Sequence, residues 1–211
     1  MIEYIVVSLI WWFFLSSCII SAGYHRYFAH NTFKAPVWYE YLVLILGPLS
    51  GAGNILGWAG VHRLHHRYPD TKEDPHSPHF TPVWQVITST FKVPPIKRMH
   101  LKDLMRNKRV MWFYKNHHYI WYTYFFMLAF IPFTWWVVFF ITPMIYGYIG
   151  YGFLNWWCHS GNEVKNSALA NILTGGEGWH KNHHKRPHSW RIGLEWWQWD
   201  PAAWFIVLIK K

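Results

Sequence analysis

Three long apolar stretches alternate with basic, histidine-rich segments along the chain: residues 4–22, 38–61 and 119–158. The first has 19 residues. As an α-helix rising about 1.5 Å per residue, it would match a bilayer hydrocarbon core roughly 30 Å thick. We therefore predict that residues 4–22 form a membrane-spanning helix.

The third stretch contains 40 residues without a single Asp, Glu, Lys or Arg. One spanning helix requires about 20 apolar residues, so residues 119–158 predict a hairpin of two spanning helices. Proline residues favour breaks between helices, and we place the turn between Pro132 and Pro143.

The second stretch is long enough to cross a bilayer, but Glu40, Gly47, Pro48 and four further glycines interrupt it. Backbone broken by Gly and Pro is tolerated at membrane depth only where protein or a cavity covers it. Residues 38–61 therefore predict a bent re-entrant or interfacial helix pair. The expected fold class is an all-α integral membrane protein with about three spans plus this re-entrant element.

The composition fits one membrane-embedded domain over residues 1–211. The chain is 52% hydrophobic and only 14% charged, against roughly 25% charged in an ordinary soluble domain. These values exclude a disordered or fibrous chain. All twenty Lys and Arg lie outside the apolar stretches, which is the distribution that the positive-inside rule produces. We attribute the net charge of +10 to membrane topology and predict no nucleic-acid partner.

The basic residues also predict sidedness. Eleven lie between Arg63 and Lys115, and seven more follow His159. Residues 62–118 and 159–211 are therefore expected to form a cytoplasmic cap, with Met1 on the opposite side.

Three histidine clusters carry the candidate chemistry. They are His25 and His30 (HX4H), His62, His65 and His66 (HX2HH), and His180, His183 and His184 (HX2HH). On an α-helix, positions i, i+3 and i+4 share an arc of about 100°, so each HX2HH cluster presents three imidazoles on one face. Imidazole is a common ligand for Zn, Cu, Fe and Ni, and these eight exceed the three or four histidines of one zinc site. The count predicts two metal ions.

Asn155 and His159 add a further candidate pair at the end of the third stretch. Their i, i+4 spacing aims both side chains at one site. Ligands on opposite sides of a bilayer cannot share a metal site, so all clusters must lie on one side. The hairpin over 119–158 crosses twice and returns, which requires residues 38–61 to dip and return as well.

These residues resemble the membrane fatty acid desaturases, specifically the group that holds the stearoyl-CoA and bacterial delta-9 desaturases. The similarity runs through residues 22–26, 30–35, 58–77 and 176–179. The three histidine boxes follow the family's order, and the Asn155 and His159 pair lies between the second and third boxes.

The resemblance implies a cap that holds two iron ions, with O2 as co-substrate and no bound organic cofactor. Asn155 is implied to hold a metal-bound water. The implied ligands are His25, His30, His62, His65, His66, His159, His180, His183 and His184. The remaining histidines match no ligand position and are expected at the surface or behind the ligands: His76, His79, His100, His117, His118 and His188.

Carboxylates that orient metal-bound imidazoles through the other ring nitrogen are expected near the ligands. The candidates are Asp70, Asp74, Glu177 and Asp200, and the sequence alone assigns none of them. A surface salt bridge is the alternative for each.

The implied reaction is O2-dependent desaturation, which removes two vicinal hydrogens from a saturated acyl chain and leaves a cis double bond at the delta-9 position. The acyl carrier is a lipid or CoA, and two electrons come from a reduced ferredoxin or cytochrome. An apolar, kinked tunnel between the spanning helices and the cap is expected to hold the chain. The implied location is a bacterial inner membrane or an endoplasmic-reticulum-type membrane, with the site on the cytoplasmic side.

Two other functions remain open at this point. The same histidine boxes support hydroxylases acting on lipid or alkyl chains, and the boxes alone do not separate that outcome from desaturation. A membrane metal carrier would need ligands or acids inside the spanning helices, and residues 119–158 contain no acid.

The chain also departs from the family pattern. One spanning helix precedes the first box, where fuller members usually have two. Ala59, Gly60 and Val61 precede the second box, where acyl-CoA members present polar groups, so a lipid-linked chain is at least as strongly indicated as acyl-CoA. The basic run over 97–109 is expected to be a solvated face, with anionic lipid or an acidic electron donor as alternatives.

Overall fold

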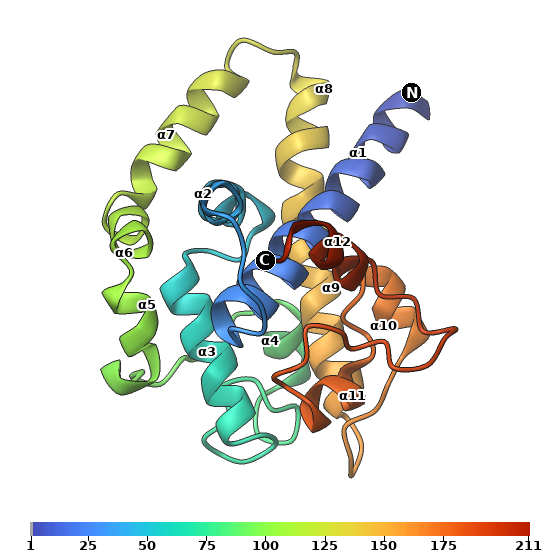
Figure 1. Cartoon of the computed structure of the whole chain (residues 1–211). Helices are drawn as coiled ribbons and strands as arrows, with labels where there is room; N and C mark the ends of the chain where they lie inside the picture. Colours follow the sequence, from blue (N-terminus) through green and yellow to red (C-terminus); the bar gives the residue numbers. More distant parts are fainter. Residues whose placement is uncertain (1) are drawn as a thin grey trace.

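The computed structural model describes residues 2–211, which fold into helices joined by loops, with no strand among them (Figure 1). The first half contains α1 (Ile2–Phe14), η1 (Leu15–Ala29), α2 (Val37–Leu46), η2 (Pro48–Ser50), α3 (Ile55–Arg67), α4 (Val83–Ile87), η3 (Arg98–Leu101) and α5 (Lys102–Arg106). The second half contains α6 (Lys108–Lys115), α7 (His117–Leu128), α8 (Phe133–Trp136), η4 (Val137–Ile141), α9 (Thr142–His159), α10 (Ala168–Leu173), α11 (His180–Lys185) and α12 (Pro201–Ile209).

The first apolar stretch forms a continuous helix of 28 residues, Ile2–Ala29, made of α1 and η1. It is one of two helices among residues 2–211 that are long and apolar enough to cross a bilayer. The helix continues past the predicted end at Ala22 because η1 is buried against α2, α3 and α12. The extra turns carry the first histidine box out of the apolar part of the helix.

The second such helix is Phe133–His159, which joins α8, η4 and α9. The other arm of the expected hairpin, α7, has only 12 residues, about 18 Å of helix. The turn lies at residues 129–132, so the prediction that placed it between Pro132 and Pro143 is wrong. Pro132 precedes α8, whereas Pro143 lies inside the continuous helix, directly after the π-helical turn η4. Local π-helical geometry is one way in which a membrane helix accommodates a proline.

The second apolar stretch is bent, as its Gly and Pro residues predict. The helices Val37–Ser50 and Ile55–Arg67 meet at 81°. Between them Gly51 and Gly53 have φ values of 84° and 67°, in the left-handed region that glycine adopts without a Cβ penalty. The bend turns α3, and with it the second histidine box, toward the box on η1.

Glu40, the one acid of this stretch, is buried in α2 and contacts residues at the start of α6. Its carboxylate accepts bonds from Arg109 at 2.6 and 2.9 Å and from the Asn107 side chain. These bonds hold α6 against α2, and they explain how an acid can occur in an otherwise apolar helix.

The helices sort into two ends of the molecule (Figure 1). The start of α1 and the turn between α7 and α8 lie at one end. The lower part of α3, α11 and the loops around them lie at the other. The C-terminal α12 packs beside η1, with Ala203 and Ile206 buried and Trp204 and Leu208 exposed.

Gly152 offers a test of this packing. A Cβ added there would collide with the carbonyl oxygen of Ile87, because α4 lies directly against α9. We expect Gly152→Ala to lower the free energy of unfolding by about 2 kcal/mol or more, since neither backbone can yield cheaply. Thermal melting in detergent measures the effect. Gly161→Ala is the matched control, because its added Cβ meets only one atom, at 3.7 Å. Equal melting temperatures for the two variants would contradict the close packing.

Candidate metal centre

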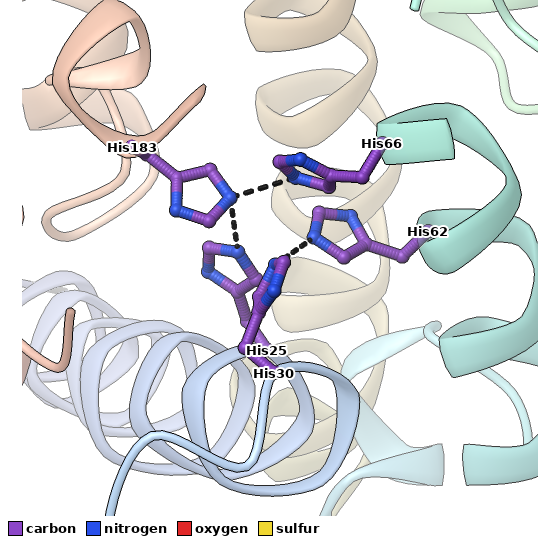
Figure 2. Close-up of side chains that lie close together, drawn as sticks. All are labelled: His25, His30, His62, His66 and His183. Atoms are coloured by element: carbon purple, nitrogen blue, oxygen red, sulfur yellow. Dashed lines mark hydrogen bonds between the residues drawn. The ribbon is translucent and has the colours of Figure 1, made fainter. Parts of the chain in front are cut away.

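The structure brings all nine predicted histidine ligands into two adjacent groups. The first, the five-histidine group, is drawn in Figure 2 and contains His25, His30, His62, His66 and His183. The second, the four-histidine group, contains His65, His159, His180 and His184. Within each group the candidate ligand atoms all lie within 4.8 Å of one another. Two groups match the two metal ions that the histidine count predicts.

The π-helical geometry of η1 explains the HX4H box. In an α-helix, residues five apart point about 140° away from each other. In a π-helix, each N–H bonds the carbonyl five residues earlier, so such residues stack. The His30 N–H donates to the His25 carbonyl at 3.0 Å, and the two imidazole centroids are 4.9 Å apart. The spacing of this box is therefore itself a signal for a π-helix, one that the α-helical reading of the sequence missed.

The two HX2HH boxes are each divided between the groups. On α3, His62 and His66 face the five-histidine group, while His65 faces the four-histidine group. On α11 the division is reversed, since His180 and His184 enter the four-histidine group and His183 enters the other. Each helix thus supplies both groups, and the last residue of α9, His159, completes the four-histidine group.

The ring nitrogens that converge are the Nε2 atoms. In the five-histidine group, Nε2 pairs lie 2.9 Å apart for His25 and His183, and 2.8 Å apart for His30 and His62 (Figure 2). In the four-histidine group, His159 and His180 approach to 3.0 Å. Two nitrogen ligands at right angles on one metal, each about 2.1 Å from it, are about 3.0 Å apart. The spacing therefore fits neighbouring ligands on shared cations.

Three buried or half-buried carboxylates contact the opposite ring nitrogen, Nδ1. His65 donates to Asp74 at 2.7 Å and His159 to Asp70 at 3.0 Å, while His25 Nδ1 lies 2.7 Å from Glu177. A proton held on Nδ1 leaves the Nε2 lone pair directed into the group. Three of the four candidate acids thus orient a predicted ligand.

The fourth candidate acid, Asp200, contacts no histidine and instead pairs with Arg26. The Arg26 guanidinium is buried at 1% exposure and lies 2.8 Å from Asp200 and 3.3 Å from Glu177. Ser21 also donates to Glu177. The structure thus places Arg26 inside the protein, where it fixes the carboxylate behind His25.

Burial keeps the rings available as ligands. Desolvation, with the neighbouring His25 adding to it, lowers the pKa of His30 to about 2. Desolvation and the nearby His159 lower the pKa of His184 to about 3. Both imidazoles are therefore neutral at pH 7, which is the form that binds a metal. Nine imidazole nitrogens, three of them on rings that contact a carboxylate, suit a borderline cation such as iron.

His76 is a residue whose place the sequence did not resolve. It is buried, its ring centroid is 4.4 Å from that of His65, and its backbone N–H donates to Asp74. It thus lies directly behind the four-histidine group. The other five histidines that match no ligand position belong to neither group.

A cavity of about 420 Å³ lies against both groups and reaches the bend between η2 and α3. Its walls include His25, His62, His180, Trp58, Tyr148 and Asn155. No Lys or Arg lines it among the described residues, and its one acid, Glu177, is already held by His25 and Arg26, so the space suits an uncharged chain. Asn155 lines this cavity.

Comparison with known proteins agrees with this geometry. The chain matches the family model described as fatty acid desaturase over residues 4–206. It is 32% identical to the sn-1 stearoyl-lipid 9-desaturase of Synechocystis sp., covering 89% of this chain and 63% of that protein. It is 31% identical to Delta-9 acyl-lipid desaturase 2 of Arabidopsis thaliana, covering 97% of this chain and 72% of that protein. It is 30% identical to Acyl-CoA 5-desaturase AL21 of Anemone leveillei, covering 90% of this chain and 63% of that protein. The chain thus spans less than two thirds of two of these relatives.

The carboxylate behind His159 gives the first test of the centre. Asp70→Ala should weaken metal binding by about 10- to 100-fold, because the ring loses the acceptor that fixes its orientation. Metal content after dialysis against graded chelator measures this. The control is Glu163→Ala, which breaks only an exposed pair with Lys181. Unchanged metal retention in Asp70→Ala would refute the orienting role.

The dependence of stability on pH provides the second test of the centre. The unfolded chain takes up protons on His30 and His184 near pH 6.5, while the folded, metal-free protein does not until the pH falls toward 3. Stability therefore falls as the pH drops below 6.5, by about 1.4 kcal/mol per histidine for each pH unit. Melting temperatures of the metal-free protein should decline between pH 7.5 and 5.5. The metal-loaded protein should keep its melting temperature to a lower pH, because a bound cation opposes protonation of the imidazole rings. A flat profile for the metal-free protein would argue against buried neutral rings.

Proposed function

The chain belongs to the fatty acid desaturase family, and on that premise we propose that it introduces a cis double bond into a saturated acyl chain. We place the bond at the delta-9 position, the specificity for which two relatives are named. The observation that carries this proposal is the convergence of nine imidazole Nε2 atoms beside a cavity without Lys or Arg.

The two histidine groups would hold two irons, with the nine histidines as ligands and Asn155 retaining a metal-bound water. Such a metal pair supplies the O2 activation that removal of hydrogen from an unactivated methylene requires, which no acid–base side chain provides. Glu177, Asp74 and Asp70 keep three of the ligand rings in the required tautomer and orientation.

The overall reaction balances with two electrons and two protons from outside. A –CH2–CH2– unit, one O2, two electrons and two protons give –CH=CH– and two molecules of water. The acyl chain loses two electrons and O2 gains four, so an external carrier must deliver the other two. We propose a reduced ferredoxin or cytochrome as that carrier.

The cavity would position the chain. Its volume falls within the range of roughly 300 to 1,000 Å³ typical of ligand sites. Trp58 and Tyr148 contribute to its walls, and His25 and His180 bring both groups to it. A chain held there would present one pair of methylenes to the metals, since rigid walls fix its register.

The names of the relatives support a proposal for the carrier of the acyl chain. Relatives are named for acyl-lipid and for acyl-CoA substrates, and we propose both as carriers for this chain.

The two long apolar helices would anchor the protein in a membrane. The excess of Lys and Arg among residues 62–118 and 159–211 supports a centre on the cytoplasmic side.

Fatty acid analysis of bacterial cells that express the chain tests the proposal. We expect new monounsaturated acids with the wild-type protein and none with His183→Ala, which removes a ligand of the five-histidine group. His117→Ala is the matched control, because His117 is exposed and lies outside both groups. Hydroxylated products would move the function to the hydroxylase alternative. An unchanged lipid profile with metal-loaded, folded wild-type protein would contradict desaturation.

A further inference from the structure

A tryptophan ring packs directly on the five-histidine group. Trp58 precedes His62 by four residues on α3, so the two side chains share one face of the helix. Their rings are stacked, with centroids 5.0 Å apart and an angle of 18° between the planes. Trp58 also meets His25 edge to face, at a centroid distance of 6.2 Å. Its indole therefore packs against two of the imidazoles drawn in Figure 2.

This contact sets Trp58 apart from the other aromatic side chains. The chain contains 17 Trp and 13 Tyr. Among residues 2–211, Trp58 is the one member of this set whose ring packs on a candidate ligand imidazole. Anchoring at the bilayer surface, the usual role of Trp in membrane proteins, does not account for a ring placed at the candidate metal centre.

A second oxidisable ring continues the path from Trp58 toward the surface. Tyr24 of η1 lies edge to face with Trp58, at a centroid distance of 5.8 Å. Tyr24 is 1% exposed, and its hydroxyl donates a hydrogen bond of 2.8 Å to the carbonyl of Gly53. Gly53 is exposed, at the bend before α3. The two rings thus connect the five-histidine group to backbone that water can reach.

The Tyr24 ring is held in place by close packing. It covers Gly47, where an added Cβ would collide with the ring. The edge-to-face contact with Trp58 is one of the two arrangements that aromatic rings prefer. The separation between the two rings is therefore fixed by the packing of η1 against the bent second stretch.

The proposed reaction creates a use for such rings whenever the acyl chain is missing. Reduction of one O2 to two waters consumes four electrons, and the acyl chain supplies two of them. Without a chain, those two electrons must come from the protein, which exposes the ligand imidazoles to oxidation. Indole and phenol lose an electron more readily than imidazole does. Trp58 lines the cavity proposed for the chain, beside His25 and His62.

We propose that Trp58 and Tyr24 form a relay that carries oxidising equivalents from the five-histidine group to the surface at Gly53 when no acyl chain is bound. This inference rests on the proposed function, which supplies the activation of O2. Trp58 loses one electron and its indole N–H proton, and Tyr24 loses one electron and its phenol O–H proton. Both rings become neutral radicals.

These losses complete the balance for O2. The two electrons and two protons from the rings, with two electrons and two protons from outside, reduce one O2 to two waters. Two thiols in solution would then restore the rings, because each gives up one electron and one proton and the two sulfurs join as a disulfide. The relay therefore spares the ligand imidazoles at the expense of a soluble reductant.

Rapid-freeze electron paramagnetic resonance tests the relay on reduced, iron-loaded protein mixed with O2 and no acyl chain. A steroid-based detergent keeps straight alkyl chains out of the cavity. The wild type should give an organic radical whose spectrum narrows when its tryptophans carry ring-deuterated indole. Trp58→Phe should lose this signal and accumulate several-fold more oxidised ligand histidine, measured by peptide mass spectrometry. Tyr24→Phe should keep the tryptophan radical and lengthen its lifetime several-fold.

Trp112→Phe is the matched control, because Trp112 is 56% exposed on α6 and its ring packs on Phe113. It should match the wild type in radical yield and in histidine oxidation. Iron content, melting temperature and O2 uptake establish that each variant is loaded, folded and reactive.

Four results would overturn the inference. They are no O2 uptake by the reduced, chain-free wild type, uptake without a radical, an equal signal in Trp58→Phe, or an unchanged radical lifetime in Tyr24→Phe. Desaturation of an added stearoyl lipid is measured on the same preparations. A protein that makes the double bond but no radical would lose the relay and keep the proposed function. Radicals without an unsaturated product would do the reverse.

Discussion

The close approach of nine imidazole Nε2 atoms is the constraint on which the rest of the structure depends. Three of these rings place Nδ1 2.7 to 3.0 Å from Glu177, Asp74 or Asp70, and their Nε2 atoms lie near 3 Å from those of neighbouring rings. A proton on Nδ1 leaves the Nε2 lone pair pointing inward. Lone pairs packed in this way repel unless a cation lies between them. The carboxylates behind the rings and the donors in front therefore fit one arrangement, a pair of metal ions shared among four segments of the chain.

The fold can be understood as the means of bringing those segments together. The π-helical register of η1 stacks two histidines five residues apart, and the bend at Gly51 and Gly53 turns α3 toward them. Arg26, buried between Asp200 and Glu177, ties η1 to the C-terminal segment. The apolar helices extend from this arrangement toward the turn between α7 and α8 at the opposite end of the molecule (Figure 1).

Much of the centre could be predicted from local spacing, because HX2HH places rings on one helical face whatever the tertiary context. The division of each box between two groups could not, since it depends on how α3 and α11 pack. The roles of Asp70, Asp74 and Glu177 also needed the fold, because His159 and Asp70 are 89 residues apart. The turn near Pro132 was misplaced because two prolines offered equal breaks. Pro143 proved compatible with a continuous helix.

The most direct test of the account is X-ray absorption at the iron edge, with metal analysis, on protein from iron-supplemented cells. The account predicts two irons per chain, each with only nitrogen and oxygen neighbours at about 2.1 Å. Sulfur in the first coordination shell, a single metal per chain, or zinc in place of iron would contradict it.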